Sequence, residues 1–320
     1  MEVKGVQYKI RIQGLKTPEG TIPLLALKEL SLNLLDGAEK ALRLSVEGAS
    51  VKRGALPEWL RKSLEFTVTG IKKGSTILEI EAPTLEEAAP EQIRQQNLWY
   101  TFPEPKDTAV SLLSKSVSEV TSEHLESEYY DSGVLKALLS FDSVLKEYVS
   151  EFEVDSQERP KEHFKINRDE LGKISQIKAK TPKPRAVVLT GLFNVIEHAT
   201  RRFKLTLENG ANIPGSADPS SIDTEYMRTL WGKDVTIKGI AYFNPSGKIR
   251  FLEAQLLKQF EAGEKIFQDI SESQSPLLEV EEAKAKFGIK SPLKEVWGQW
   301  PGEESIDQLL AALNEISKEN

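Results

Sequence analysis

A series of β-rich segments in the second half of the chain constrains its fold most strongly. An Asn-Gly pair at 209–210 is typical of a tight hairpin turn, and Asn-Pro-Ser-Gly at 244–247 is a second turn sequence. A helix is expected over 221–230. Strands are predicted from β-branched, aromatic and alternating apolar residues over 187–196, 203–207, 211–215, 234–243 and 248–256. The predicted order is therefore three strands, a helix and two strands.

This order resembles the OB-fold, a small five-stranded barrel that commonly carries a helix between its third and fourth strands. The resemblance covers residues 185–260 and rests on the order of the elements. It implies a β-barrel whose outer strands can bind oligonucleotides. A different small barrel or a rolled sheet is the alternative.

The first half of the chain mixes helix and strand patterns. Residues 6–12 alternate apolar and polar side chains, as a half-buried strand does. An amphipathic helix is expected over 21–46, a hairpin over 64–80, and further helices before residue 155. The fold class is therefore α+β. The predicted parts are an α+β domain at 1–155, a basic helix and linker at 156–184, an OB-like barrel at 185–260 and an acidic helical tail at 261–320.

Composition excludes several classes of protein. The chain of 320 residues has no cysteine, which removes disulfide frameworks, thiolate metal sites and thiol nucleophiles and agrees with a reducing compartment. No apolar run approaches the roughly 20 residues that cross a bilayer. We therefore expect a cytoplasmic protein with no membrane partner.

Catalytic motifs are missing from the sequence. The Gly70–Ser75 segment has neither the Walker spacing nor the dinucleotide fingerprint. His124 and Glu128 have helical spacing, but no third ligand accompanies them, so no metal site is predicted. We expect a non-enzymatic protein without a cofactor.

Positive charge gathers in the middle of the chain. Residues 158–205 carry twelve Lys and Arg against five Asp and Glu, a balance of +7 in a chain whose net charge is −7. Such a segment attracts phosphates by counterion release, and barrel aromatics can stack on bases. The alternative is that the lysines solvate a linker and the aromatics fill the core. The aromatics are Phe193, Phe203, Tyr242 and Phe251, and the candidate nucleic-acid-binding residues are Lys178, Lys180, Lys183, Arg185, Arg201, Arg202 and Lys204.

The C-terminal tail predicts a partner-binding helix. Residues 262–320 hold twelve acidic side chains and six Lys, a balance of −6. Ser305 and Gln308 have capping-box spacing, and an apolar stripe follows. A helix this short is marginal alone, so the stripe must cover a surface, either of its own chain or of a partner. The candidate partner-binding residues are Trp297, Trp300, Ile306, Leu309, Leu310, Leu313 and Ile316.

The stretch from Trp297 to Leu313 resembles the C-terminal ends of small bacterial antitoxins that neutralise PIN-domain ribonuclease toxins. In those tails an aromatic and Pro-Gly or acidic step precedes a short leucine-rich helix in the toxin groove. The resemblance implies an antitoxin-like interaction protein with a PIN-domain nuclease toxin as its partner. This tail has no Arg, so steric occlusion of the nuclease is favoured over insertion of a positive charge. The alternative function, of another class, is binding of single-stranded nucleic acid by the barrel and the basic segment.

Overall fold

The computed structural model describes residues 5–18, 20–52, 54–72, 76–94, 103–197, 201–218 and 220–260, and leaves out the side chains of residues 94 and 195–197. These residues form an α+β structure with two separate hydrophobic cores, one for the N-terminal helices and sheet and one for a closed barrel. The α+β class and the five-stranded barrel are therefore confirmed. All the candidate partner-binding residues of the tail lie outside the described residues.

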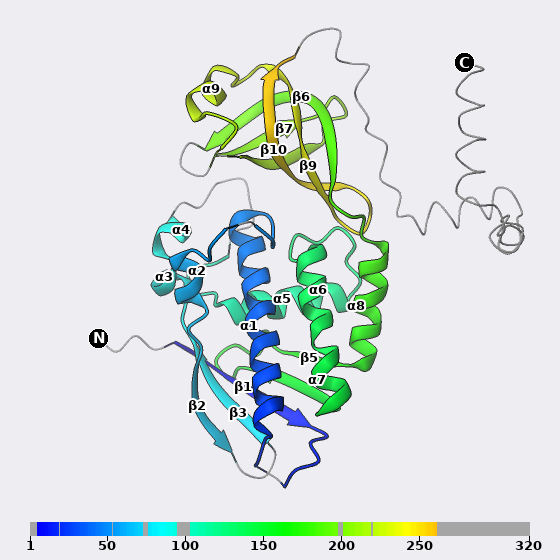
Figure 1. The fold of residues 1–320 in the computed structure, drawn as a ribbon. Helices are drawn as coiled ribbons and strands as arrows, with labels where there is room; N and C mark the ends of the chain where they lie inside the picture. The colour runs from blue at the N-terminus through cyan, green and yellow to red at the C-terminus, as the bar shows by residue number, and fades with distance from the viewer. Residues whose placement is uncertain are drawn as a thin grey trace, which may run out of the picture. The chain divides into compact units, whose positions relative to one another are not determined.

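The N-terminal domain contains a five-stranded antiparallel sheet in the order β2-β3-β1-β4-β5 (Figure 1). Its central strand β1 alternates buried and exposed residues, and Tyr8 and Ile10 lie in the core. The outer face carries charged side chains, and this division between faces follows from the period of two along a strand. The strands are β1 (Val6–Gln13), β2 (Thr67–Lys72), β3 (Thr76–Ala82), β4 (Glu151–Asp155) and β5 (Phe164–Asn167).

Helices pack on this sheet, and Figure 1 shows α1, α6 and α8 side by side. Helix α1 also contacts α5. Three side chains cap helix starts by accepting backbone N–H bonds, namely Thr108 on α5, Asp131 on α6 and Asn167 on α8. The helices are α1 (Leu24–Glu47), α2 (Glu58–Ser63), α3 (Leu85–Ala88), α4 (Pro90–Arg94), α5 (Ala109–Thr121), α6 (Ser132–Ser140), α7 (Asp142–Glu147) and α8 (Arg168–Lys180).

The segment 156–184, expected as a basic helix and linker, contributes to the N-terminal domain. Strand β5 pairs with β4, and helix α8 buries Leu171, Ile174 and Ile177 in the first core. Because lysines occupy the remaining faces of α8, the number of charged residues in this segment does not reveal its apolar stripe. The sheet and core of the first domain thus extend past the expected boundary at residue 155, and the connection to the barrel is residues 181–184.

The barrel closes in the order β10-β8-β7-β6-β9, with α9 between β8 and β9 along the chain. Strand β6 pairs with β9 along its first half and with β7 along its second half. Gly191 lies at this change of partner, where a Cβ would stand 2.5 Å from the carbonyl oxygen of Thr206. The elements are β6 (Arg185–Glu197), β7 (Arg202–Thr206), β8 (Asn212–Ala217), α9 (Thr224–Thr229), β9 (Asp234–Phe243) and β10 (Ile249–Gln259).

Candidate nucleic-acid interface

The outer face of β6, β7 and β8 is the part of the barrel on which an OB-like ligand site is expected. On β7, Phe203 and Leu205 point into the barrel core, so Lys204 and Thr206 project outward. On β8, Ile213 is buried and its neighbour Asn212 is exposed. The alternation therefore builds a polar surface over an apolar core.

A β-bulge at Asn194 directs its side chain across this face. Leu192 pairs with Thr206 and Phe193 pairs with Leu205, but the next pair joins Val195 to Lys204, so Asn194 is an extra residue in β6. Such a bulge bends a strand and redirects its side chains. The amide nitrogen of Asn194 donates to the Thr206 hydroxyl at 2.6 Å.

The hydrogen bonds continue onto the third strand, because the Thr206 hydroxyl donates to Oδ1 of Asn212 at 2.7 Å. Asn194, Thr206 and Asn212 thus form a chain of hydrogen bonds over three strands, named here the amide chain. Within the described part of the protein, the Asn194 side-chain oxygen and the Asn212 side-chain nitrogen have no other hydrogen bond. Both atoms are therefore available to polar groups of a ligand.

Trp231 lies beside the bulge with its ring exposed. Its side chain is 67% exposed, and its indole nitrogen donates to the backbone oxygen of Asn194 at 2.7 Å. The backbone next to it is fixed by bonds from Gly232 N–H to the Phe193 oxygen (2.8 Å) and from Phe193 N–H to the Lys233 oxygen (3.0 Å). The indole is thus held at its edge while much of its ring remains accessible to solvent.

Neither Trp231 nor the amide chain is among the residues predicted from the sequence. One sequence feature could have indicated Trp231. It lies between the predicted helix 221–230 and Gly232, outside the predicted helix and strands, so a large ring there is not explained by core packing. No local sequence pattern predicts the bulge, because the register of β6 against β7 is a property of the folded sheet.

The predicted basic residues do not all belong to this face. Lys178 and Lys180 lie in the last turn of α8, and Lys183 lies in the connection to the barrel. Arg185 begins β6 and pairs with β9, with its guanidinium 5.3 Å from the centre of the Phe243 ring. These four residues are therefore placed on other elements than β7 and β8.

The remaining three basic residues surround the start of β7. Arg201 has a left-handed backbone conformation (φ 54°) and donates to the Ile222 oxygen at 3.2 Å, so it braces a loop. The Arg202 guanidinium donates to the backbone oxygen of Val46 at the end of α1. Lys204 is the one member of the predicted set that projects from the middle of the β7 outer face.

The predicted stacking aromatics are not exposed platforms. Phe193 and Phe203 pack in the barrel core with ring centres 5.2 Å apart, whereas Phe251 is buried outside that core, against Gly48 at the end of α1. Tyr242 is half-buried, and its hydroxyl donates to Glu253 at 3.0 Å. The alternative that these rings fill the barrel core is confirmed for Phe193 and Phe203, because a closed barrel of five strands has room for side chains alone, and it is wrong for Phe251.

Two barrel arginines bind the C-terminal end of α1. Arg250, largely buried, donates to the backbone oxygen of Gly48 and lies 3.8 Å from the Asp131 carboxylate. Arg202 donates to Val46 in the same turn. The last turn of α1 contains no basic residue of its own, so these cations interact favourably with its unsatisfied carbonyl groups and dipole.

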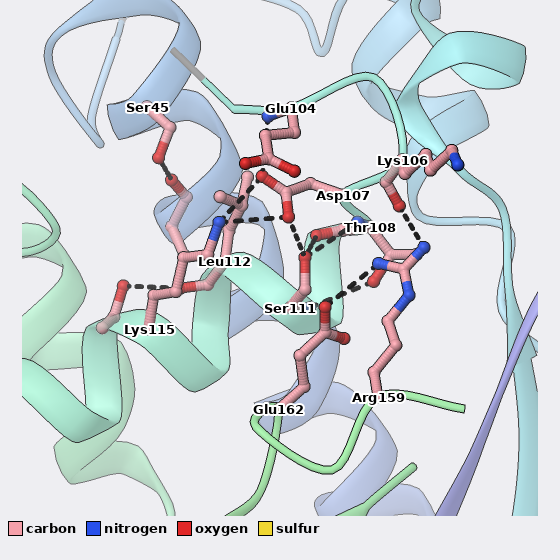
Figure 2. Close-up of polar contacts among 12 residues, drawn as sticks. Ser45, Glu104, Lys106, Asp107, Thr108, Ser111, Leu112, Lys115, Arg159 and Glu162 are labelled. Atoms are coloured by element: carbon pink, nitrogen blue, oxygen red, sulfur yellow. Dashed lines mark hydrogen bonds and ion pairs between the residues drawn. The ribbon is translucent and has the colours of Figure 1, made fainter. Parts of the chain in front are cut away.

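The N-terminal domain contains a largely buried network of charged and polar groups around Asp107. Figure 2 shows Asp107 between Lys115 and Ser111, with Nζ of Lys115 at 2.9 Å from the carboxylate. Thr108 and Ser111 form a reciprocal capping box at the start of α5. These contacts fix the entry into α5.

The second half of the network joins distant segments. Arg159 and Glu162 face one another with a nitrogen–oxygen distance of 3.0 Å, and Arg159 also donates to the Lys106 backbone oxygen (Figure 2). Glu162 accepts from Tyr8 at 2.6 Å. Because the charged groups of this network are all engaged in contacts with one another, it holds segments together rather than presenting reactive groups.

The histidines of the described residues do not gather ligands. His124 lies 3.0 Å from Glu119 and His163 lies 2.6 Å from Glu153, each with a single carboxylate. A group of three or more metal-ligating side chains is absent from the part of the chain that the structure describes, and none of its helices is both long and apolar enough to cross a membrane.

Comparison with family models, with curated proteins and with solved structures finds no match to this chain.

Proposed function

We propose that the barrel binds single-stranded nucleic acid along the outer face of β6, β7 and β8. The observation that carries this proposal is the strand order together with the position of α9 between β8 and β9. That arrangement is the one found in OB-folds, in which the face of the second and third strands binds oligonucleotides. Here the corresponding strands are β7 and β8.

The charge of the barrel agrees with an anionic ligand of modest affinity. Residues 185–260 carry ten Lys and Arg against seven Asp and Glu, and ten minus seven gives +3. Lys204 projects from the β7 outer face beside the amide chain. A single strand rather than a duplex is expected, because an exposed aromatic ring can stack only on bases that are unpaired.

The test is fluorescence anisotropy of labelled single-stranded oligonucleotides with the full chain at about 50 mM and about 200 mM salt. We expect binding that weakens with salt, and Lys204→Gln should lower both the affinity and the salt slope, the latter by about one unit. Lys180→Gln on α8 is the matched control and should bind like the wild-type protein. Undetectable binding at the lower salt concentration would reject the proposal.

A second candidate function rests on the sequence of the tail. We propose that the segment from Trp297 to Ile316 binds a PIN-domain nuclease as an antitoxin-like helix, and its support is the aromatic and Pro-Gly step before the leucine-rich stripe. Co-expression with such a nuclease followed by purification of the complex tests it. Deletion of residues 291–320 should abolish co-purification, whereas a deletion variant that retains the nuclease would reject it.

A further inference from the structure

We propose that Trp231 and the amide chain of Asn194, Thr206 and Asn212 form a base-binding subsite in which the indole stacks on an unpaired base. This inference rests on the proposed function of the barrel and names the part of the face that would hold a base. Its ligand is a single-stranded oligonucleotide recognised through the bases as well as through the phosphates.

The Trp231 ring is exposed and yet held in place. A tryptophan that is 67% exposed gains little from folding, since most of its apolar area stays in water. Its indole nitrogen is nevertheless held at 2.7 Å from the Asn194 oxygen. The ring therefore loses rotational freedom in the folded protein before any ligand binds, which reduces the entropy cost of stacking.

Hydrogen-bonding groups that suit the edge of a base lie beside the ring. The backbone oxygen that holds Trp231 belongs to Asn194, the same residue whose side chain begins the amide chain. An asparagine amide offers both a donor and an acceptor to the edge of a base. Because Asn194 and Asn212 each use one of these functions on Thr206, the acceptor of the first and the donor of the second are left for a ligand.

Leu192 adds an apolar side chain to this face. Leu192 lies two residues before Asn194 on β6, pairs with Thr206 on one side and Asp234 on the other, and is 37% exposed. This exposed leucine on β6 and the exposed indole bonded to the Asn194 backbone oxygen offer apolar area that a flat, partly apolar ring can cover. Covering them would remove apolar area from water.

The surrounding charge shapes the expected behaviour. Lys204 lies two residues before Thr206 and Lys233 two residues after Trp231, while the carboxylates of Glu208 and Asp234 lie close to these lysines in sequence. Electrostatic attraction is then limited, and base stacking supplies a large share of the affinity. Since every base has a π-face, we expect little preference among base sequences.

The experiment compares two probes of equal length and charge, a single-stranded oligothymidylate and the same strand with abasic sites at its central positions, each titrated with the full-length protein. The wild-type protein should bind the abasic strand about tenfold more weakly. Trp231→Ala should bind the normal strand about tenfold more weakly than the wild-type protein does. Its affinity for the abasic strand should fall only slightly, and the salt dependence of binding should be unchanged.

Tyr226→Ala is the matched control, since Tyr226 is an aromatic residue of neighbouring helix α9 with 43% exposure. It should bind both strands like the wild-type protein. Trp231→Phe should recover part of the loss, and thermal melting of each variant verifies that the barrel is folded.

Two results would overturn the inference in different ways. If Trp231→Ala binds both strands like the wild-type protein, the subsite is wrong and the proposed function of the barrel remains. If the wild-type protein binds neither strand, or if oligosaccharides quench Trp231 fluorescence while oligonucleotides do not, the proposed function fails together with the subsite.

Discussion

The Tyr8 hydroxyl donates to the Glu162 carboxylate at 2.6 Å, although 154 residues separate the two along the chain. The same hydroxyl lies 2.8 Å from the Thr108 side chain. Tyr8 is on the central strand of the sheet, Thr108 begins α5, and Glu162 lies in the connection before β5. One buried phenol therefore joins the sheet, a helix start and a distal loop.

Removing this hydroxyl should destabilise the N-terminal domain. Tyr8→Phe leaves Glu162 and Thr108 without one partner, and we expect the free energy of unfolding to fall by about 1–3 kcal/mol. Urea denaturation followed by circular dichroism measures the change. Tyr226→Phe, at an exposed ring, should leave the midpoint unchanged, and equal midpoints for both variants would contradict the assigned role of Tyr8.

Alkaline pH should destabilise the protein through its buried tyrosines. Burial, followed by the nearby charge of Glu119, raises the pKa of Tyr130 to about 12, and burial with Glu253 raises the pKa of Tyr242 to about 12. Burial and Glu162 raise the pKa of Tyr8 still further.

The direction of this pH effect follows from the linkage between proton binding and folding. A tyrosine whose folded pKa exceeds its unfolded pKa, about 10, binds its proton more tightly in the folded state. Its contribution to stability is complete below pH 10 and is lost as the pH rises toward 12. Absorbance at 295 nm should show late-titrating tyrosines, with one fewer in Tyr242→Phe. Titration of all tyrosines near pH 10 while the protein stays folded would refute this prediction.

Replacing Asp131, the N-cap of α6, should destabilise the folded protein. It accepts from the backbone N–H groups of Gly133 and Val134 and from both the backbone and the hydroxyl of Ser50. Asp131→Ala should cost about 2–3 kcal/mol because a buried cap and its partners are lost together.

The matched control for this prediction is Asp142→Ala at the start of α7, where the carboxylate forms an exposed ion pair with Lys146. Chemical denaturation should show a change within about 1 kcal/mol for it. A smaller effect at Asp131 than at Asp142 would show that the cap contributes little.

Gly239 should be indispensable to the barrel. A Cβ at this position would stand 2.1 Å from the Glu253 backbone oxygen on the adjacent strand, so Gly239→Ala must separate β9 from β10. Because the two cores are separate, hydrogen exchange should show lost protection in the barrel while the amides of α1 and α5 stay protected.

Gly172→Ala provides the contrast, since nothing lies within 4 Å of its added Cβ in α8. It should stabilise the protein by up to about 1 kcal/mol through helix propensity. If hydrogen-exchange protection of the barrel is unchanged in Gly239→Ala, β9 and β10 accommodate the added methyl group without loss of stability, and the prediction is wrong.

Several elements were determined by the sequence alone, because their signals are local. The alternation over 6–12 predicts β1. Among the further helices expected before residue 155, an apolar face is predicted from the spacing of Val134, Leu138, Phe141, Leu145 and Tyr148. The structure buries the first four of these residues, leaves Tyr148 half-buried, and divides the predicted helix into α6 and α7 at Phe141. The strand and helix order of the barrel follows from the turn residues and β-rich runs in the same way.

The tertiary structure decided which surfaces meet. No local pattern shows that α8 buries its stripe in the N-terminal core, that Arg202 binds the end of α1, or that a bulge directs Asn194 toward Thr206. These relationships depend on strand register and on contacts between segments far apart in the chain. Residue spacing sets the period of an element, whereas the choice of partner depends on the packing of all elements together.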